Sequence, residues 1–104
     1  MTTKKKSDAM KFLEKLAGEL TLAGLLMAIR QGEEMSQVEF AKLLGISRQY
    51  LCDIEHKRRT ISPHAAAMFA KILGYSPQQF VRLCLQDLVN RDGLKLKIDV
   101  RDAA

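Results

Sequence analysis

Apolar residues recur every three to four positions along most of this chain, and this spacing predicts a series of short helices. Serine or threonine precedes several of these runs and glycine follows them, as expected at helix ends. The predicted helices cover residues 8–20, 21–31, 36–44, 47–55, 62–73 and 76–90. Residues 1–7 are polar and are predicted to form a disordered tail before the N-terminal helical extension at 8–20.

The segment 36–55 has the most informative spacing. Ser36 and Glu39 form a capping-box pattern, and Gly45 adopts at little steric cost the positive φ that ends a helix. Ser47 then caps a second helix. The segment therefore predicts two short helices joined by a tight turn, the arrangement that places a helix in the major groove of DNA.

The C-terminal residues 91–104 depart from the helical period. Leu94 to Val100 alternate apolar and charged residues, which predicts a single β-strand. One strand cannot satisfy its own backbone groups, so it must pair with a second copy or a partner protein, or stay loose. The wide apolar surface of helix 76–90 favours a homodimer over a buried helix with a frayed tail. The predicted dimer interface comprises Phe80, Cys84, Leu88, Leu94, Leu96 and Ile98.

Composition limits the chain to one compact domain, because it has 104 residues of which 47% are hydrophobic. The net charge is +5, but Lys4 to Lys6 supply three of these charges. Overall charge is therefore a weak argument for a polyanionic partner. The local cluster of Arg48, Lys57, Arg58 and Arg59, on and just after the second helix of the pair, is a stronger one.

Several functional classes are disfavoured by what the sequence lacks. Cys52 and Cys84 are far apart and have no CxxC spacing, which indicates reduced thiols rather than a disulfide or a metal site. His56 and His64 are isolated, and no catalytic grouping or phosphate-binding glycine loop occurs, so neither an enzyme nor a cofactor is expected. The longest apolar stretch, Leu20 to Ile29, is too short to span a membrane, so a cytoplasmic location is expected.

Residues 22–90 resemble the XRE/Cro-type helix-turn-helix domain of phage repressors and bacterial regulators. Gln37, Ala41, Gly45, Leu51 and Ile54 occupy characteristic positions of that family. The resemblance implies an all-α, five-helix, lambda-repressor-like domain at 21–90, to which this chain adds an N-terminal helix and a single C-terminal β-strand. It also implies a buried ion pair between Arg30 and Glu55. The later residues Ile61, Ser62, Pro63, Ala70, Lys71, Leu73, Gly74, Ser76, Pro77 and Phe80 are similar to HigA/VapI-type antitoxins.

The predicted DNA contacts fall into two groups. Base contacts are assigned to Arg48, Gln49, Tyr50 and Asp53, and phosphate contacts to Gln37, Ser47, Lys57, Arg58 and Arg59. Arginine can bind guanine and glutamine can bind adenine through paired hydrogen bonds. For Tyr50, packing on the neighbouring helix is an equal alternative. Asp53 would either accept from cytosine or hold Arg48, and Lys57 stands where the family often has glycine.

Two functions follow as expectations. The first is a homodimeric repressor that binds double-stranded DNA at a near-palindromic operator, with half-sites about 10 bp apart. The alternative is an antitoxin that neutralises a toxin protein through the tail or the helix at 8–20 and regulates its own operon.

Overall fold

The computed structural model describes residues 20–103 and contains five helices within that range. They are α2 (Leu22–Gly32), α3 (Gln37–Leu44), α4 (Arg48–Glu55), α5 (Pro63–Leu73) and α6 (Pro77–Arg91). This confirms the all-α, five-helix prediction, with boundaries within one or two residues of those expected. The predicted tail at 1–7 and residues 8–19 of the predicted helix at 8–20 lie outside the described residues. Across the described part of the chain, no helix combines the length and apolar character needed to cross a membrane.

Local capping accounts for the helix boundaries. The hydroxyls of Thr21, Ser36, Ser47 and Ser62 each accept a backbone N–H at the start of α2, α3, α4 and α5. The capping box predicted at Ser36 is complete, because the Glu39 carboxylate in turn accepts the N–H of Ser36 at 3.1 Å. Gly45 ends α3 at a φ of 75°, in the left-handed region that favours glycine.

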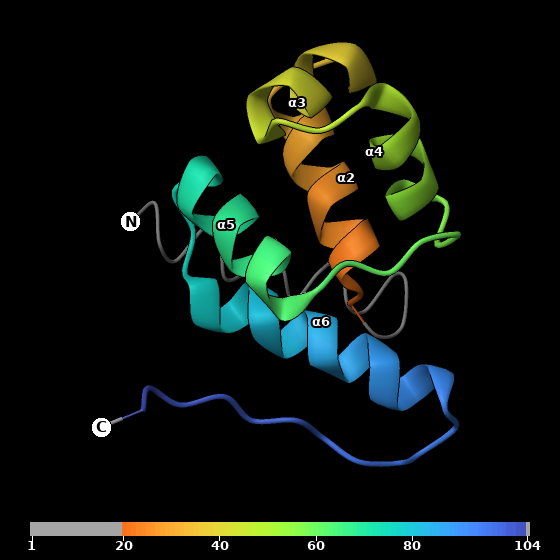
Figure 1. The fold of residues 1–104 in the computed structure, drawn as a ribbon, viewed down its shortest axis with the longest axis vertical. Coiled ribbons are helices and arrows are strands. Elements are labelled where there is room, and N and C mark those ends of the chain that lie inside the picture. The colour runs from red at the N-terminus through yellow and green to blue at the C-terminus, as the bar shows by residue number, and fades with distance from the viewer. Residues whose placement is uncertain (1–19, 104) are drawn as a thin grey trace.

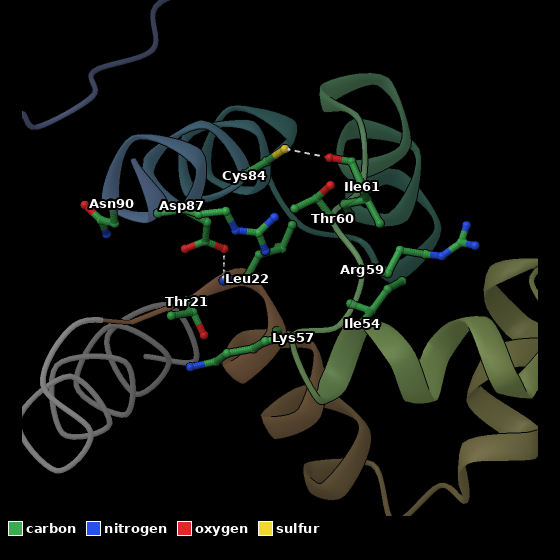
Figure 2. Close-up of a pocket in the computed structure, with 12 residues that line it drawn as sticks. Thr21, Leu22, Ile54, Lys57, Arg59, Thr60, Ile61, Cys84, Asp87 and Asn90 are labelled. Carbon is green, nitrogen blue, oxygen red and sulfur yellow. Dashed lines mark hydrogen bonds between the residues drawn. The ribbon is translucent and has the colours of Figure 1, made fainter. Parts of the chain in front are cut away.

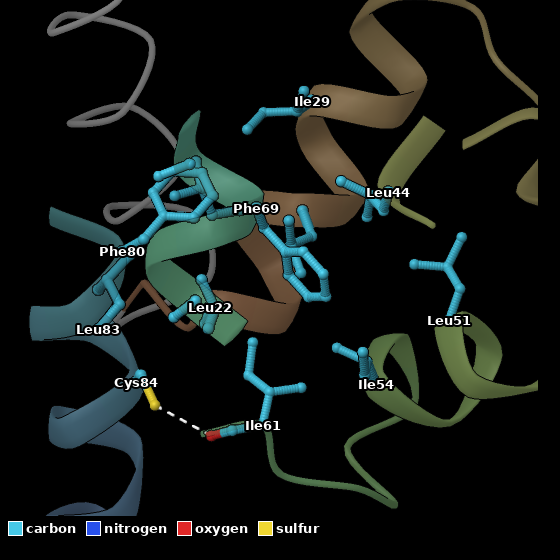
Figure 3. Close-up of a cluster of buried hydrophobic side chains, with 14 of the residues drawn as sticks. Leu22, Ile29, Leu44, Leu51, Ile54, Ile61, Phe69, Phe80, Leu83 and Cys84 are labelled. Atoms are coloured by element: carbon cyan, nitrogen blue, oxygen red, sulfur yellow. Dashed lines mark hydrogen bonds between the residues drawn. The ribbon is translucent and has the colours of Figure 1, made fainter. Parts of the chain in front are cut away.

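The core lies where all five helices meet (Figure 3). Its largest fully buried side chains are Phe40, Phe80, Leu26, Leu51 and Leu83, which come from α2, α3, α4 and α6. α5 packs on α6, while α3 packs on α4 and α2 contacts both α4 and α6. The short helix α4 is therefore fixed from behind by α2 and α3, which leaves its opposite face open (Figure 1).

Two residues of the predicted dimer interface are not at the surface. Phe80 is 0% exposed and Cys84 is 4% exposed, and both belong to the core of their own chain. The Cys84 thiol donates to the backbone oxygen of Ile61 at 3.1 Å, and burial raises the pKa of this thiol. The prediction was wrong for these two residues because the packing of α5 against α6 covers that face. Leu88, Leu94 and Leu96 are exposed, and Ile98 is partly buried.

The predicted C-terminal β-strand is absent from the described residues, because no strand ladder forms at 94–100. The segment instead runs back along α6, from the end of that helix towards its start (Figure 1). Its backbone is held by the side-chain amide of Gln86, which donates to the oxygen of Leu96 at 2.7 Å and accepts the N–H of Ile98 at 2.8 Å. Residues 20–103 offer no neighbouring strand, so within this part of the chain the alternating sequence cannot form a sheet.

Candidate nucleic-acid interface

The helix pair α3–α4 has the geometry that the spacing predicts. Ala41 is 2% exposed at the crossing, where a small side chain allows the two helices to approach. The N–H of Ile46 donates to the oxygen of Ala41 at 3.0 Å and closes the turn after Gly45. Leu51 and Ile54 face the core, so the first turn of α4 carries Arg48 and Gln49 on its exposed side. Base edges are reached from this position in a helix-turn-helix.

A buried ion pair fixes the far end of α4. Arg30 of α2 donates to both carboxylate oxygens of Glu55, from Nε at 2.8 Å and from Nη2 at 3.2 Å. The Glu55 side chain is 1% exposed and that of Arg30 is 15% exposed. Arg30 also donates to the backbone oxygen of Met35 at 3.1 Å. The pair expected from the family resemblance is therefore present, and it joins α2 to the last turn of α4.

Gln37 belongs to the same group of side chains. Its amide nitrogen donates to Glu55 Oε1 at 3.0 Å, which ties the start of α3 to the end of α4. The sequence indicated a phosphate contact and missed this positioning contact. An amide nitrogen has two N–H groups, so the bond to Glu55 leaves the second one for an anion at the N-terminus of α3.

A second, exposed group of side chains lies on the open face of α4. Asp53 Oδ1 accepts from Gln49 Nε2 at 3.0 Å and from Arg58 Nε and Nη2 at 3.1 and 2.9 Å. These bonds, first from Arg58 and then from Gln49, hold the pKa of Asp53 below its usual value, while Asp53 raises the pKa of Arg58. The alternative in which Asp53 holds Arg48 is replaced by contacts with Gln49 and Arg58.

Tyr50 and Arg59 form the flank of this face. The Arg59 guanidinium lies over the Tyr50 ring at 4.4 Å from its centroid, a cation–π contact. Tyr50 is partly buried and packs against the core, as in the alternative raised from the sequence. The ring thus supports Arg59 while its exposed part remains beside Arg48 and Gln49.

The loop after α4 has Lys57 at the position where the family often has glycine. This lysine adopts a φ of 60°, so it takes the left-handed conformation that glycine would take at lower cost. Its N–H donates to the oxygen of Ile54, and the N–H of Arg58 donates to the oxygen of Asp53 at 2.8 Å. The loop after α4 therefore keeps a tight turn with lysine in place of glycine. It presents Lys57, Arg58 and Arg59 as exposed cations.

A cavity of about 380 Å³ lies behind this loop, between the start of α2 and α6 (Figure 2). On one wall, Asp87 accepts the N–H of Leu22 at 3.1 Å, and on another Cys84 donates to Ile61. These contacts attach α2 and the loop to α6. In Figure 2, Arg59 points away from the cavity towards α4, so the cationic side chains of the loop lie on different surfaces of the protein.

The open face of α4 is therefore positively charged and polar. Its cations Arg48, Arg58 and Arg59 outnumber the single carboxylate of Asp53, and Ser47 is exposed at the helix N-terminus. Lys57 is also exposed, but its side chain points away from α4 and lines the cavity (Figure 2). No group of three or more metal-ligating side chains occurs between residues 20 and 103. An exposed helix with amide and guanidinium groups at its start and cations at its end fits the grooved, anionic surface of duplex DNA.

The comparison with protein families agrees with this geometry. The family model described as Helix-turn-helix matches residues 26–80, slightly more than half of the chain, and this range includes the whole α3–α4 pair. The chain belongs to the XRE-type helix-turn-helix family of DNA-binding transcription regulators. A search of curated proteins found no match to the sequence.

Proposed function

We propose that this protein is a repressor that binds a near-palindromic operator as a homodimer and has no enzymatic activity. The observation that carries the proposal is the position of α4. Its buried side is bound to α2 and α3 through Glu55, while Arg48 and Gln49 stand exposed at its first turn. A recognition helix held in this way presents the same side chains to every site that it meets, which sequence-specific binding requires.

Each predicted contact has a distinct task in this proposal. Arg48 and Gln49 bind base edges, and Tyr50 and Asp53 lie next to them. The hydrogen bond from Gln49 to Asp53 fixes the orientation of the Gln49 amide before DNA arrives. The phosphate contacts come from Gln37, Ser47, Lys57, Arg58 and Arg59, and they position the helix without selecting a sequence.

The experiment is a binding selection on random duplex DNA, followed by footprinting of the preferred site. We expect a site with two-fold symmetry and half-sites about 10 bp apart. The double variant Arg48→Ala/Gln49→Ala should lose the preference for that site, because each paired base contact contributes about 1–3 kcal/mol of discrimination. Weak, salt-dependent binding to any duplex should remain, because the phosphate contacts are intact.

A matched control removes one arginine and one glutamine elsewhere. Gln31 and Arg91 are exposed near the C-terminal ends of α2 and α6, outside both α4 and the segment 94–100. Gln31→Ala/Arg91→Ala should keep the footprint of the parent protein. An unchanged footprint for Arg48→Ala/Gln49→Ala would contradict the assignment of those two residues.

The antitoxin function is a second candidate, because the tail carries two exposed leucines. Leu94 and Leu96 are 51% and 59% exposed, respectively, and such side chains suit a protein partner. Co-purification with the full chain, compared with a chain ending at residue 91, tests this candidate. A tail that captures no protein and is required only for self-association would reject it.

A further inference from the structure

The C-terminal segment presents one defined backbone edge to α6. Gln86 is 4% exposed, and its amide bonds the oxygen of Leu96 and the N–H of Ile98, the groups on either side of Lys97. The remaining N–H of the Gln86 amide donates to Asn90 at 2.9 Å. The buried amide thus takes the place of a neighbouring strand for this part of the tail, and it determines which edge of the tail faces inward.

The opposite edge of the tail faces away from α6. In an extended chain the N–H and C=O of alternate residues point to opposite edges, so the backbone groups of Lys95, Lys97 and Asp99 point outward. All three residues are exposed, and between residues 20 and 103 no hydrogen bond engages their backbone. An open edge of this kind is a template for pairing with another strand.

We propose that the partner at this edge is the same segment of a second copy, paired antiparallel, with Lys97 opposite Lys97 of that copy on the two-fold axis. This inference rests on the proposed homodimer and assigns its interface. In this register Leu94 faces Val100 of the second copy and Leu96 faces its Ile98. The exposed leucines are thereby paired with apolar residues.

The charges select this register over its neighbours. With Lys97 on the axis, Lys95 of each copy lies opposite Asp99 of the other, which makes two favourable pairs. Asp99 is available for exchange, because its bond to Arg101 joins side chains that are 71% and 87% exposed. Only the central lysine pair is unfavourable.

Shifting the register by two residues in either direction is worse. One shift places Lys95 opposite Lys97 of the second copy, twice. The other places Lys97 opposite Asp99 twice, but it also places Lys95 opposite Arg101 twice and brings Leu94 opposite Asp102. Both retain the outward edge as the paired edge, so the charge pattern alone discriminates among the three registers.

Cross-linking through single cysteines tests the register. In a Cys52→Ser background, with Cys84 buried, Lys97→Cys places two thiols on a directly opposed pair whose Cα atoms lie about 5.5 Å apart, within disulfide range. Mild oxidation at micromolar concentration should convert most of the chain to a covalent dimer. Lys95→Cys and Asp99→Cys alone should stay monomeric on a denaturing gel, because equivalent residues are more than about 13 Å apart. Mixing these two variants should restore the cross-link.

Charge exchange provides a second readout that needs no cysteine. Asp99→Lys places two lysines opposite each other twice and leaves no favourable charge pair in either neighbouring register, so the dissociation constant from sedimentation should rise about tenfold or more, and Lys95→Glu/Asp99→Lys should restore it. Equal cross-linking of all three single-cysteine variants, or a double variant as weak as Asp99→Lys, would overturn the proposed register. A chain that stays monomeric at all concentrations would also overturn it.

Binding of the Cys52→Ser parent to the selected duplex is measured in parallel. The Cys52→Ser parent could bind a symmetric site as a dimer while the Lys97→Cys variant cross-links no better than its controls. This result would overturn the tail pairing and leave the proposed function standing. If the Lys97→Cys variant cross-links selectively but the Cys52→Ser parent binds no duplex, the tail pairing is supported and the proposed function is rejected.

Discussion

Two groups of hydrogen-bonded side chains, each centred on a carboxylate of α4, contain the same chemical groups but differ in their exposure to water. Glu55 is held by Arg30 and Gln37, and Asp53 is held by Arg58 and Gln49. The first carboxylate side chain is 1% exposed, and the second is 25% exposed and paired with an arginine that is 53% exposed. Each group joins one carboxylate, one guanidinium and one amide, but only the first is shielded from water.

The difference lies in what each group can accomplish. A buried charge without its partner is costly, so the Glu55 group holds three helices in one arrangement. An exposed pair contributes little to stability, because water and salt screen it. The Asp53 group therefore orients Gln49 and Arg58 on the exposed side of α4, which we propose faces DNA, without contributing much to the fold. Burial, rather than residue type, separates positioning from recognition.

The largest expected effect is on the free energy of unfolding, when each of the two carboxylates is replaced by its isosteric amide. Glu55→Gln should lower the free energy of unfolding by about 3 kcal/mol, because it leaves the Arg30 guanidinium unpaired and turns an amide NH₂ towards it. The value is at the lower end of the usual range because Arg30 retains some exposure. Urea unfolding followed by circular dichroism measures the change.

Asp53→Asn is the control for that comparison. It removes the same charge from the exposed group and should leave the urea midpoint close to that of the parent. Equal destabilisation by the two substitutions would show that burial does not distinguish the groups.

The next effect compares the two amides. Gln37→Ala removes a hydrogen bond to a buried carboxylate and should cost about 1.5–3 kcal/mol. Gln49→Ala removes the corresponding bond in the exposed group and should leave the unfolding transition unchanged. The DNA measurements should show the reverse order, because Gln49 faces the duplex. A loss of operator preference that is larger for Gln37→Ala than for Gln49→Ala would break the division between positioning and recognition.

The smallest effect is a pH dependence confined to the exposed group. Asp53 has a lowered pKa in the folded chain, so its contribution to stability is present above the pKa of the unfolded chain. The contribution should be lost as the pH falls through the lower folded value. The difference in unfolding free energy between the parent and Asp53→Asn, measured from pH 7 to pH 2, should therefore vanish at the acid end. A difference that persists at pH 2 would show that the charge of Asp53 is not its source.

Much of the fold could be predicted from the sequence because its determinants are local. The capping box at Ser36 and Glu39, the positive φ of Gly45 and the cap at Ser47 act within one or two helical turns. Helical spacing likewise identified Leu51 and Ile54 as core residues. Their effects on the backbone do not depend on distant contacts, so the α3–α4 pair was predictable in position and type.

The errors concern contacts between elements. Phe80 and Cys84 carry an apolar pattern on α6 that suits either a core or an interface, and only the position of α5 decided for the core. The alternation at 94–100 indicates a strand, but a strand requires a neighbour that the described part of the chain does not provide. Nothing in the spacing of Gln86 indicates that its amide bonds the tail.

The sequence by itself determined where the helices of residues 20–103 begin and end, and that α4 would carry Arg48 and Gln49 at its start. The tertiary structure alone decided which distant polar groups meet: Gln37 with Glu55, and Gln86 with the tail. The physical reason is the range of the interactions. Capping and helical periodicity act over a few residues of the chain. The partner of a side chain 10 or 20 residues away depends on how packed helices bring it within hydrogen-bonding distance.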